Sequence, residues 1–211
     1  MKIKSITPPV TGWLEIDLDE NIITHLNKLI DQSKIDNISM KDSLAGHITS
    51  SLELKDREDY LMDNLLINCA NQFDQAFPAS AKLINHIGTQ QRLVLNSLWV
   101  NFQKKHEFNP MHDHSGVFSF VIWMKIPTDW KEQAKLPFME GQNHSSVSNF
   151  EITYMDTDFT LNQSYYQMSP EMEGKMLFFS SRLKHGVYPF YESDGTRISI
   201  SGNLMLSLIH I

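Results

Sequence analysis

The chain has 211 residues, of which 41% are hydrophobic and 20% charged, the balance of an ordinary globular protein with a sizeable core. Its formal net charge of -7 gives no general attraction for phosphate backbones or anionic lipid, so we expect neither nucleic acid nor membrane as a partner. The single cysteine, Cys69, excludes an internal disulfide. The single cysteine and an N-terminus that lacks a long apolar segment together predict a cytoplasmic protein.

Helical periodicity dominates the first ninety residues. Hydrophobic residues recur at helical spacing in "LDENIITHLNKLIDQSK" (18–34), and Asp19 is a suitable N-cap. The pattern returns in "DREDYLMDNLLINCANQFDQAF" (56–77), which Pro78 ends. The segment between them, "MKDSLAGHITSSLELK" (40–55), is less regular and is predicted to be a loop.

From residue 91 the pattern changes to short strands. Four are predicted: "RLVLNSLWVNFQ" (92–103), "GVFSFVIWMKIP" (116–127), "NFEITYMD" (149–156) and "GKMLFFSS" (174–181). "HGVYPFY" (185–191) and "RISISGNLML" (197–206) are predicted as the arms of a hairpin, and residues 128–147 and 157–173 as polar connections. Strands without intervening helices predict an α+β fold with a mainly β core. We expect one domain, 1–211, with a helical lobe over 1–90 and a cupin-like jelly roll over 91–206.

Two histidines flank one aspartate in "NPMHDHSG" (109–116). In an extended chain, residues i and i+2 project to the same side, so His112 and His114 can converge while Asp113 points away. Two imidazoles at this spacing suit Fe, Zn, Cu or Ni. His185, which follows an apolar strand and precedes Gly186, is the best candidate for a third ligand. The alternative is that all three histidines are loop or turn residues. The remaining histidines are weaker candidates: His25, His47, His86, His106, His144 and His210.

Arg197 opens the last predicted strand, in which Ser199 shares its face and isoleucines occupy the other face. Either the polar face that carries Arg197 and Ser199 (the polar row) faces water, or it lines a barrel interior and holds an anion. In the second case Arg197 would bind a carboxylate through two hydrogen bonds and Ser199 would add a third. The predicted hairpin favours this reading because its other arm carries His185. On the strand before the histidines, Asn101 is a predicted pocket residue and Trp99 a predicted core residue.

A histidine pair, a distal histidine and Arg-x-Ser twelve residues later resemble the 2-oxoglutarate- and Fe(II)-dependent oxygenases. More narrowly, "WVNFQKKHEFNPMHDHSGVFSFVIWMKIP" and "GKMLFFSSRLKHGVYPFYESDGTRISISGNL" resemble a group of oxygenases common in marine phages and bacteria. The resemblance implies a double-stranded β-helix that couples decarboxylation of 2-oxoglutarate to hydroxylation of a protein or small-molecule substrate. By position, His112 and His185 match ligands of Fe(II). Arg197 and Ser199 match the pair that binds the far carboxylate of 2-oxoglutarate.

One departure from the family pattern concerns the ligands, because His114 stands where the family has a carboxylate. We therefore predict a three-histidine site, with Asp113 as an acceptor that orients a ligand imidazole. Asp113 could replace His114 as a ligand only if the backbone left extended geometry. Glu151 or Asp156 could approach as a fourth group. Three neutral ligands favour later transition metals, which leaves the native metal open.

Two other functions compete with the oxygenase prediction. One is a three-histidine cupin-like metalloenzyme that does not use 2-oxoglutarate, and replacement of Arg197 separates the two. The other is a non-catalytic jelly-roll binding module. The sequence names no substrate and does not set the oligomeric state. Substrate groups are expected from the loops at 36–60 and 128–147.

Overall fold

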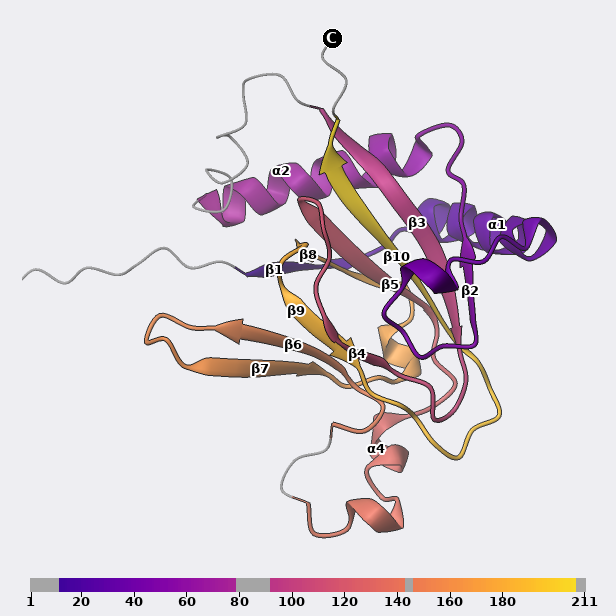
Figure 1. Ribbon diagram of the computed structural model, residues 1–211, viewed down its shortest axis with the longest axis vertical. Coiled ribbons are helices and arrows are strands. Elements are labelled where there is room, and N and C mark those ends of the chain that lie inside the picture. The colour runs from indigo at the N-terminus through magenta and orange to yellow at the C-terminus, as the bar shows by residue number, and fades with distance from the viewer. Residues whose placement is uncertain (1–11, 79–91, 143–145, 208–211) are drawn as a thin grey trace, which may run out of the picture.

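The centre of the molecule is a pair of antiparallel β-sheets that face each other (Figure 1). The computed structural model describes residues 12–78, 92–142 and 146–207. The larger sheet contains, in spatial order, β1 (Trp13–Asp17), β8 (Lys175–Ser180), β5 (Phe118–Lys125), β10 (Arg197–Leu206), β3 (Leu93–Gln103) and β2 (Ser50–Glu53). The smaller sheet contains β4 (Asn109–His112), β9 (Lys184–Val187), β6 (Phe150–Met155) and β7 (Leu161–Tyr166). The predicted jelly roll is confirmed.

Two helices cover the outer face of the larger sheet (Figure 1). They are α1 (Glu20–Asp36), whose predicted N-cap Asp19 accepts from the Ile22 backbone N–H at 2.9 Å, and α2 (Ile67–Ala76), which continues a π-helical stretch at Met62–Leu66. Leu26 and Phe73 are fully buried against this face. Burying such a side chain stabilises the fold by roughly 1.5–3 kcal/mol, so packing holds the helices on the sheet. Among the described residues, no helix is long and apolar enough to cross a membrane.

The shorter helical segments lie in connections. They are Lys41–Ser43 (η1), Trp130–Gln133 (α4), Pro137–Met139 (η4) and Pro170–Met172 (η5). The last three occupy the stretches that the sequence predicted to be polar connections. The candidate site residues therefore lie mainly on the two sheets and not on these short helices.

The sequence prediction missed four strands at the sheet edges, one of which is β4, paired with β9. β1 pairs with β8, and β2 pairs with β3 within the segment predicted to be a loop. β7 pairs with β6 inside a predicted polar connection. Each is only four to six residues long, and each becomes a strand through backbone hydrogen bonds with a neighbouring strand. The local sequence pattern says little about which neighbouring strand will pair with such a segment.

The predicted hairpin between residues 185 and 206 is wrong. β9 pairs with β4 and β6 in the smaller sheet, whereas β10 pairs with β3 and β5 in the larger one. The chain between them, 188–196, therefore crosses from one sheet to the other. His185 therefore lies on the smaller sheet and Arg197 on the larger sheet. Both line the space between the two sheets, and they are not neighbours along a hairpin.

The two faces of β10 have different surroundings. Ile200 and Leu204 are fully buried in the core cluster beneath the helices, and Ile198 packs against it. Arg197, Ser199 and Ser201 line a pocket between the sheets. Of the two readings of the polar row, the structure supports the one in which it lines the barrel interior.

Candidate active site

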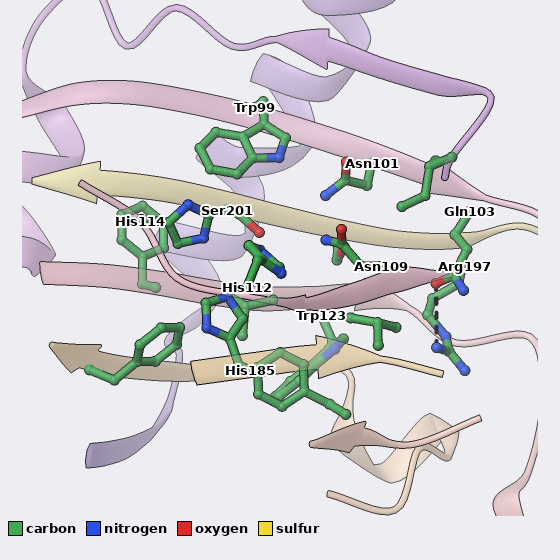
Figure 2. Close-up of a pocket in the computed structure, with 17 residues that line it drawn as sticks. Trp99, Asn101, Gln103, Asn109, His112, His114, Trp123, His185, Arg197 and Ser201 are labelled. Atoms are coloured by element: carbon green, nitrogen blue, oxygen red, sulfur yellow. Dashed lines mark hydrogen bonds between the residues drawn. The ribbon is translucent and has the colours of Figure 1, made fainter. Parts of the chain in front are cut away.

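Three histidines come together at one end of the space between the sheets (Figure 2). His112 is the last residue of β4 and pairs directly with His185 of β9, and His114 follows two residues later. One side-chain nitrogen from each ring lies within 4.8 Å of the others. This is the only group of three or more potential metal-ligating side chains found within the described residues. The i, i+2 spacing and the β4–β9 pairing together produce the convergence.

Backbone carbonyls orient two of these rings. His112 Nδ1 lies 2.7 Å from the Pro110 carbonyl oxygen, and His185 Nδ1 lies 2.9 Å from that of Leu183. Because a carbonyl oxygen can only accept, each imidazole donates from Nδ1 and keeps its Nε2 lone pair free. The expected acceptor, Asp113, instead pairs with Lys184, whose Nζ lies 3.0 Å from its carboxylate. That expectation is corrected: alternation turns Asp113 away from the rings.

The imidazoles are neutral near pH 7. Burial, and to a lesser degree the nearby His112, lowers the pKa of His185 to about 3. Burial, and again His112, lowers the pKa of His114 to about 4, and burial also lowers the pKa of His112. Three neutral imidazoles packed this closely, with lone pairs on at least two rings directed away from their carbonyl acceptors, form the kind of donor set that a transition-metal ion needs.

A buried guanidinium lies at the other end of the same space. Arg197 is 1% exposed and stacks over the Phe190 ring at 5.0 Å. Its Nη2 donates to the carbonyl and hydroxyl oxygens of Ser148 at 2.8 and 2.6 Å, and its Nη1 donates to Gln103 Oε1 at 3.4 Å. Within the described residues no carboxylate pairs with it, and its Nε has no partner. Burial lowers the pKa of Arg197 to about 9. A buried cation with a free donor suits a bound carboxylate.

One pocket is lined by both the histidines and Arg197 (Figure 2). Its middle is walled by apolar side chains from both sheets: Val121, Trp123, Phe150, Phe179 and Val187. Ser199 lines it from β10, and Asn101 from β3. Trp99, predicted to be core, is 4% exposed but also lines the pocket, with its ring 5.9 Å from that of His114. The lining groups, imidazoles at one end and a guanidinium at the other, are those that an anion with a metal-binding head and a carboxylate tail would need.

Two predicted approaches to the cluster do not occur. The Glu151 carboxylate accepts from Thr153, Gln163 and Tyr188, and its neighbour Ile152 is the residue that pairs with His185. Asp156 accepts backbone and side-chain hydrogen bonds in the β6–β7 turn. Both carboxylates are therefore committed elsewhere, and the expected fourth group is wrong.

The weaker histidine candidates also lie apart from the cluster. His25 bonds Asp56 at 3.0 Å, His47 packs on Phe108, and His106 packs on Tyr191. His86, His144 and His210 lie outside the described residues. The three histidines predicted from the sequence, His112, His114 and His185, are thus the ones that the fold brings together.

Sequence reasoning missed three polar residues of the site. Gln103 continues the alternation of Trp99 and Asn101, so its i+2 spacing could have revealed it. Asn109 opens the histidine motif and lines the pocket. Ser148 carries no local signal: it is fully buried, adopts a left-handed φ of 66°, and reaches Arg197 only through the tertiary fold.

The fold and the pocket define a class of jelly-roll proteins in which a histidine cluster shares a cavity with a buried arginine. Residues 97–203 match the family described as "Putative 2OG-Fe(II) oxygenase". The chain belongs to this family, and it is a 2-oxoglutarate- and Fe(II)-dependent dioxygenase, as the resemblance implied. The match covers both the histidine motif and Arg197. No curated protein matches the chain.

Solved structures share the fold at low sequence identity. A Pseudomonas putida prolyl-4-hydroxylase has a TM-score of 0.53 at 13% identity, over 92% of each chain. A Trichoplax adhaerens prolyl hydroxylase, in complex with a hypoxia inducible factor oxygen degradation domain peptide fragment, has a TM-score of 0.52 at 13% identity, over 93% of this chain and 83% of that one. The carbocyclase SnoK from nogalamycin biosynthesis has a TM-score of 0.53 at 11% identity, over 93% and 80%. These likenesses confirm the double-stranded β-helix fold.

Proposed function

We propose that His112, His114 and His185 hold the Fe(II), and that Arg197 and Ser199 bind the far carboxylate of 2-oxoglutarate. The observation that carries this proposal is one pocket with neutral, convergent imidazoles at one end. At its other end lies a buried guanidinium that pairs with no carboxylate of the described residues. The two ends come from different sheets, so the pocket exists only in the folded chain. Asn101 lines the same pocket and is a further candidate contact of the co-substrate.

With O2 and 2-oxoglutarate, the bound iron supplies the oxidising chemistry that hydroxylates a substrate. The chain's own residues bind and orient. The Nδ1 hydrogen bonds of His112 and His185 hold their rings with Nε2 available, and Arg197 fixes the co-substrate at the far end. The dianion of 2-oxoglutarate would balance the charge that three neutral ligands leave on the metal. The apolar walls between the two ends exclude water.

The substrate is proposed to be a protein or a small molecule. Two of the similar structures are prolyl hydroxylases, one of them with a bound peptide fragment, which makes peptides the first class to test. The acidic balance of the chain argues against a nucleic acid. A cytoplasmic location fits a chain whose only cysteine is a buried thiol, Cys69. We also propose that 1–211 forms one domain, because one core cluster joins helices and sheet.

An anaerobic titration tests the ligand and co-substrate assignments. Fe(II) and then 2-oxoglutarate are added to the apoprotein, and the visible charge-transfer band of the chelate is followed. We expect a saturable band that His185→Ala or Arg197→Ala abolishes. Arg57→Met, at an exposed arginine that does not line the pocket, should leave the band intact. Iron binding without a band would favour the cupin-like metalloenzyme. Absence of metal binding would favour the non-catalytic module and refute the proposal.

A further inference from the structure

Strand β7 forms one edge of the smaller sheet and has a neighbour on one side only. In the part of the chain that the structure describes, β7 pairs with β6 and with no other strand. The Asp156 backbone N–H donates to the Thr160 carbonyl at 3.0 Å, which makes these two residues a hydrogen-bonded pair. Because hydrogen-bonded and non-hydrogen-bonded pairs alternate along an antiparallel ladder, Leu161 and Gln163 direct their backbone N–H and C=O groups away from β6. Such a row of outward groups can bind another strand.

The other three edge strands are each protected against pairing with a further strand. Residues 38–40 lie along β2 and bond to its backbone. β4 contains Pro110, which has no N–H to donate. β1 carries Glu15 and Asp17, and charged side chains oppose contact between sheet edges. β7, with the sequence LNQSYY, has no proline, no charge and no covering segment among the described residues. Proteins usually guard such an edge, so an open one indicates an interaction surface.

Exposed apolar side chains gather where β7 begins. Met155 lies directly opposite Leu161, and the two are 62% and 67% exposed. Phe159, in the turn between them, is 82% exposed. The β6–β7 hairpin that carries these residues extends away from the other strands (Figure 1). Single exposed apolar residues are ordinary, but a cluster beside an open strand edge marks a surface that another protein covers.

The distribution of charge around β7 favours a second copy of this chain as the partner. β7 itself is neutral, and the turn before it carries Asp156 and Asp158. A two-fold axis through the interface makes the two β7 strands antiparallel, so the two acidic turns lie at opposite ends and do not repel each other. A second copy also supplies an open edge of equal length. Because the other three edges are protected, β7 meets β7, and a closed dimer forms instead of a filament.

We propose that two copies of the chain pair through their β7 strands about a two-fold axis at Gln163. The pairing joins two four-stranded sheets into one continuous sheet. With Gln163 at the axis, Leu161 lies opposite the partner's Tyr165, and an aromatic residue opposite an apolar one stabilises a strand pair. The candidate active site lies on other strands of each copy. The dimer therefore needs neither the metal nor 2-oxoglutarate, and it is tested on the full-length apoprotein.

Analytical ultracentrifugation over a wide range of protein concentration measures the association. The wild type should show a reversible monomer–dimer equilibrium. Leu161→Lys should raise the dissociation constant of the dimer by about tenfold or more, because lysine is a residue that guards open strand edges. Ile35→Lys, at an isoleucine of α1 that is 77% exposed, is the matched control and should associate as the wild type does. Both positions are exposed, so both variants should keep the circular dichroism spectrum of the wild type.

Disulfide cross-linking tests the position of the axis. The Cα atoms of a hydrogen-bonded antiparallel pair lie about 5.5 Å apart, a separation that a disulfide can span. Gln163→Cys should therefore form covalent dimers under mild oxidation. Gln32→Cys, at an exposed glutamine of α1, is the matched control and should form few. The native Cys69 is buried and does not compete.

Three results would overturn the β7 dimer. One is a wild-type chain that stays monomeric at every concentration measured. Another is a dimer that Leu161→Lys weakens no more than Ile35→Lys does, since its interface would lie elsewhere. The third is a dimer in which Gln163→Cys cross-links no faster than Gln32→Cys, which would contradict the symmetric strand pairing.

Discussion

Replacement of Arg197 by methionine should separate the effect of this buried cation on protein stability from its effect on the affinity for 2-oxoglutarate. Burial lowers the pKa of Arg197 from 12.5 to about 9, which corresponds to about 5 kcal/mol disfavouring the charged form. Its two hydrogen bonds to Ser148 return roughly 3–6 kcal/mol, at about 1.5–3 kcal/mol for each charged bond. The two contributions nearly cancel. The free energy of unfolding of the apoprotein should therefore change by no more than about 2 kcal/mol in Arg197→Met.

Binding of 2-oxoglutarate should respond very differently. Removing one partner of a buried ion pair costs about 3–5 kcal/mol, because the other charge stays buried and unpaired. The dissociation constant should rise by about two to almost four orders of magnitude. Chemical denaturation of the apoprotein and calorimetric titration with 2-oxoglutarate measure the two quantities, and Arg57→Met serves as the control. An affinity within about tenfold of wild type would refute the role of Arg197, as one order of magnitude is only about 1.4 kcal/mol.

Two further perturbations address the histidines. His114→Leu should abolish Fe(II) binding in a metal titration. His114→Asp restores a carboxylate at the family's position and should keep the Fe(II) affinity within about tenfold of wild type. Asp113→Asn should bind Fe(II) as wild type does, and loss of binding in that variant alone would make Asp113 the ligand. The apoprotein should lose stability as the pH falls below about 6.5, because unfolded histidines take up protons there whereas folded His185 and His114 do so only near 3 and 4. At pH 5 each contributes a loss of about 2 kcal/mol, measurable by denaturation at pH 7 and 5, and an equally steep loss in His185→Leu would contradict the assignment.

The strands that carry the site were predictable because their signals are local. Long alternating or continuous apolar segments marked β3, β5, β6, β8 and β10 within a few residues of their observed bounds. The short edge strands β1, β2, β4 and β7 were missed, since backbone pairing with a neighbour makes them strands. Their absence from the prediction did not change the predicted site residues, because the spacing of His112 and His114 marks the histidine motif without a strand prediction for β4.

The relation between His185 and Arg197 shows where local reasoning reached a useful conclusion through a wrong intermediate. A hairpin was expected to bring them together, but they belong to opposite sheets that share one interior. Because sheets of a jelly roll pack face to face, side chains from the inner faces of both meet in the same cavity. Strand order, and not chain proximity, connects the two ends of the pocket.

The sequence by itself determined which residue types could do the chemistry. The i, i+2 histidine pair, the distal histidine and Arg-x-Ser depend only on spacing and on the two-residue period of a strand. Only the tertiary structure decided what surrounds them. It turned Asp113 toward Lys184, gave Arg197 the neutral partner Ser148, and left Asn109 with a buried acceptor. Periodicity specifies which face of a strand a side chain occupies, whereas its hydrogen-bond partners come from segments distant in sequence whose positions depend on the packing of the whole chain.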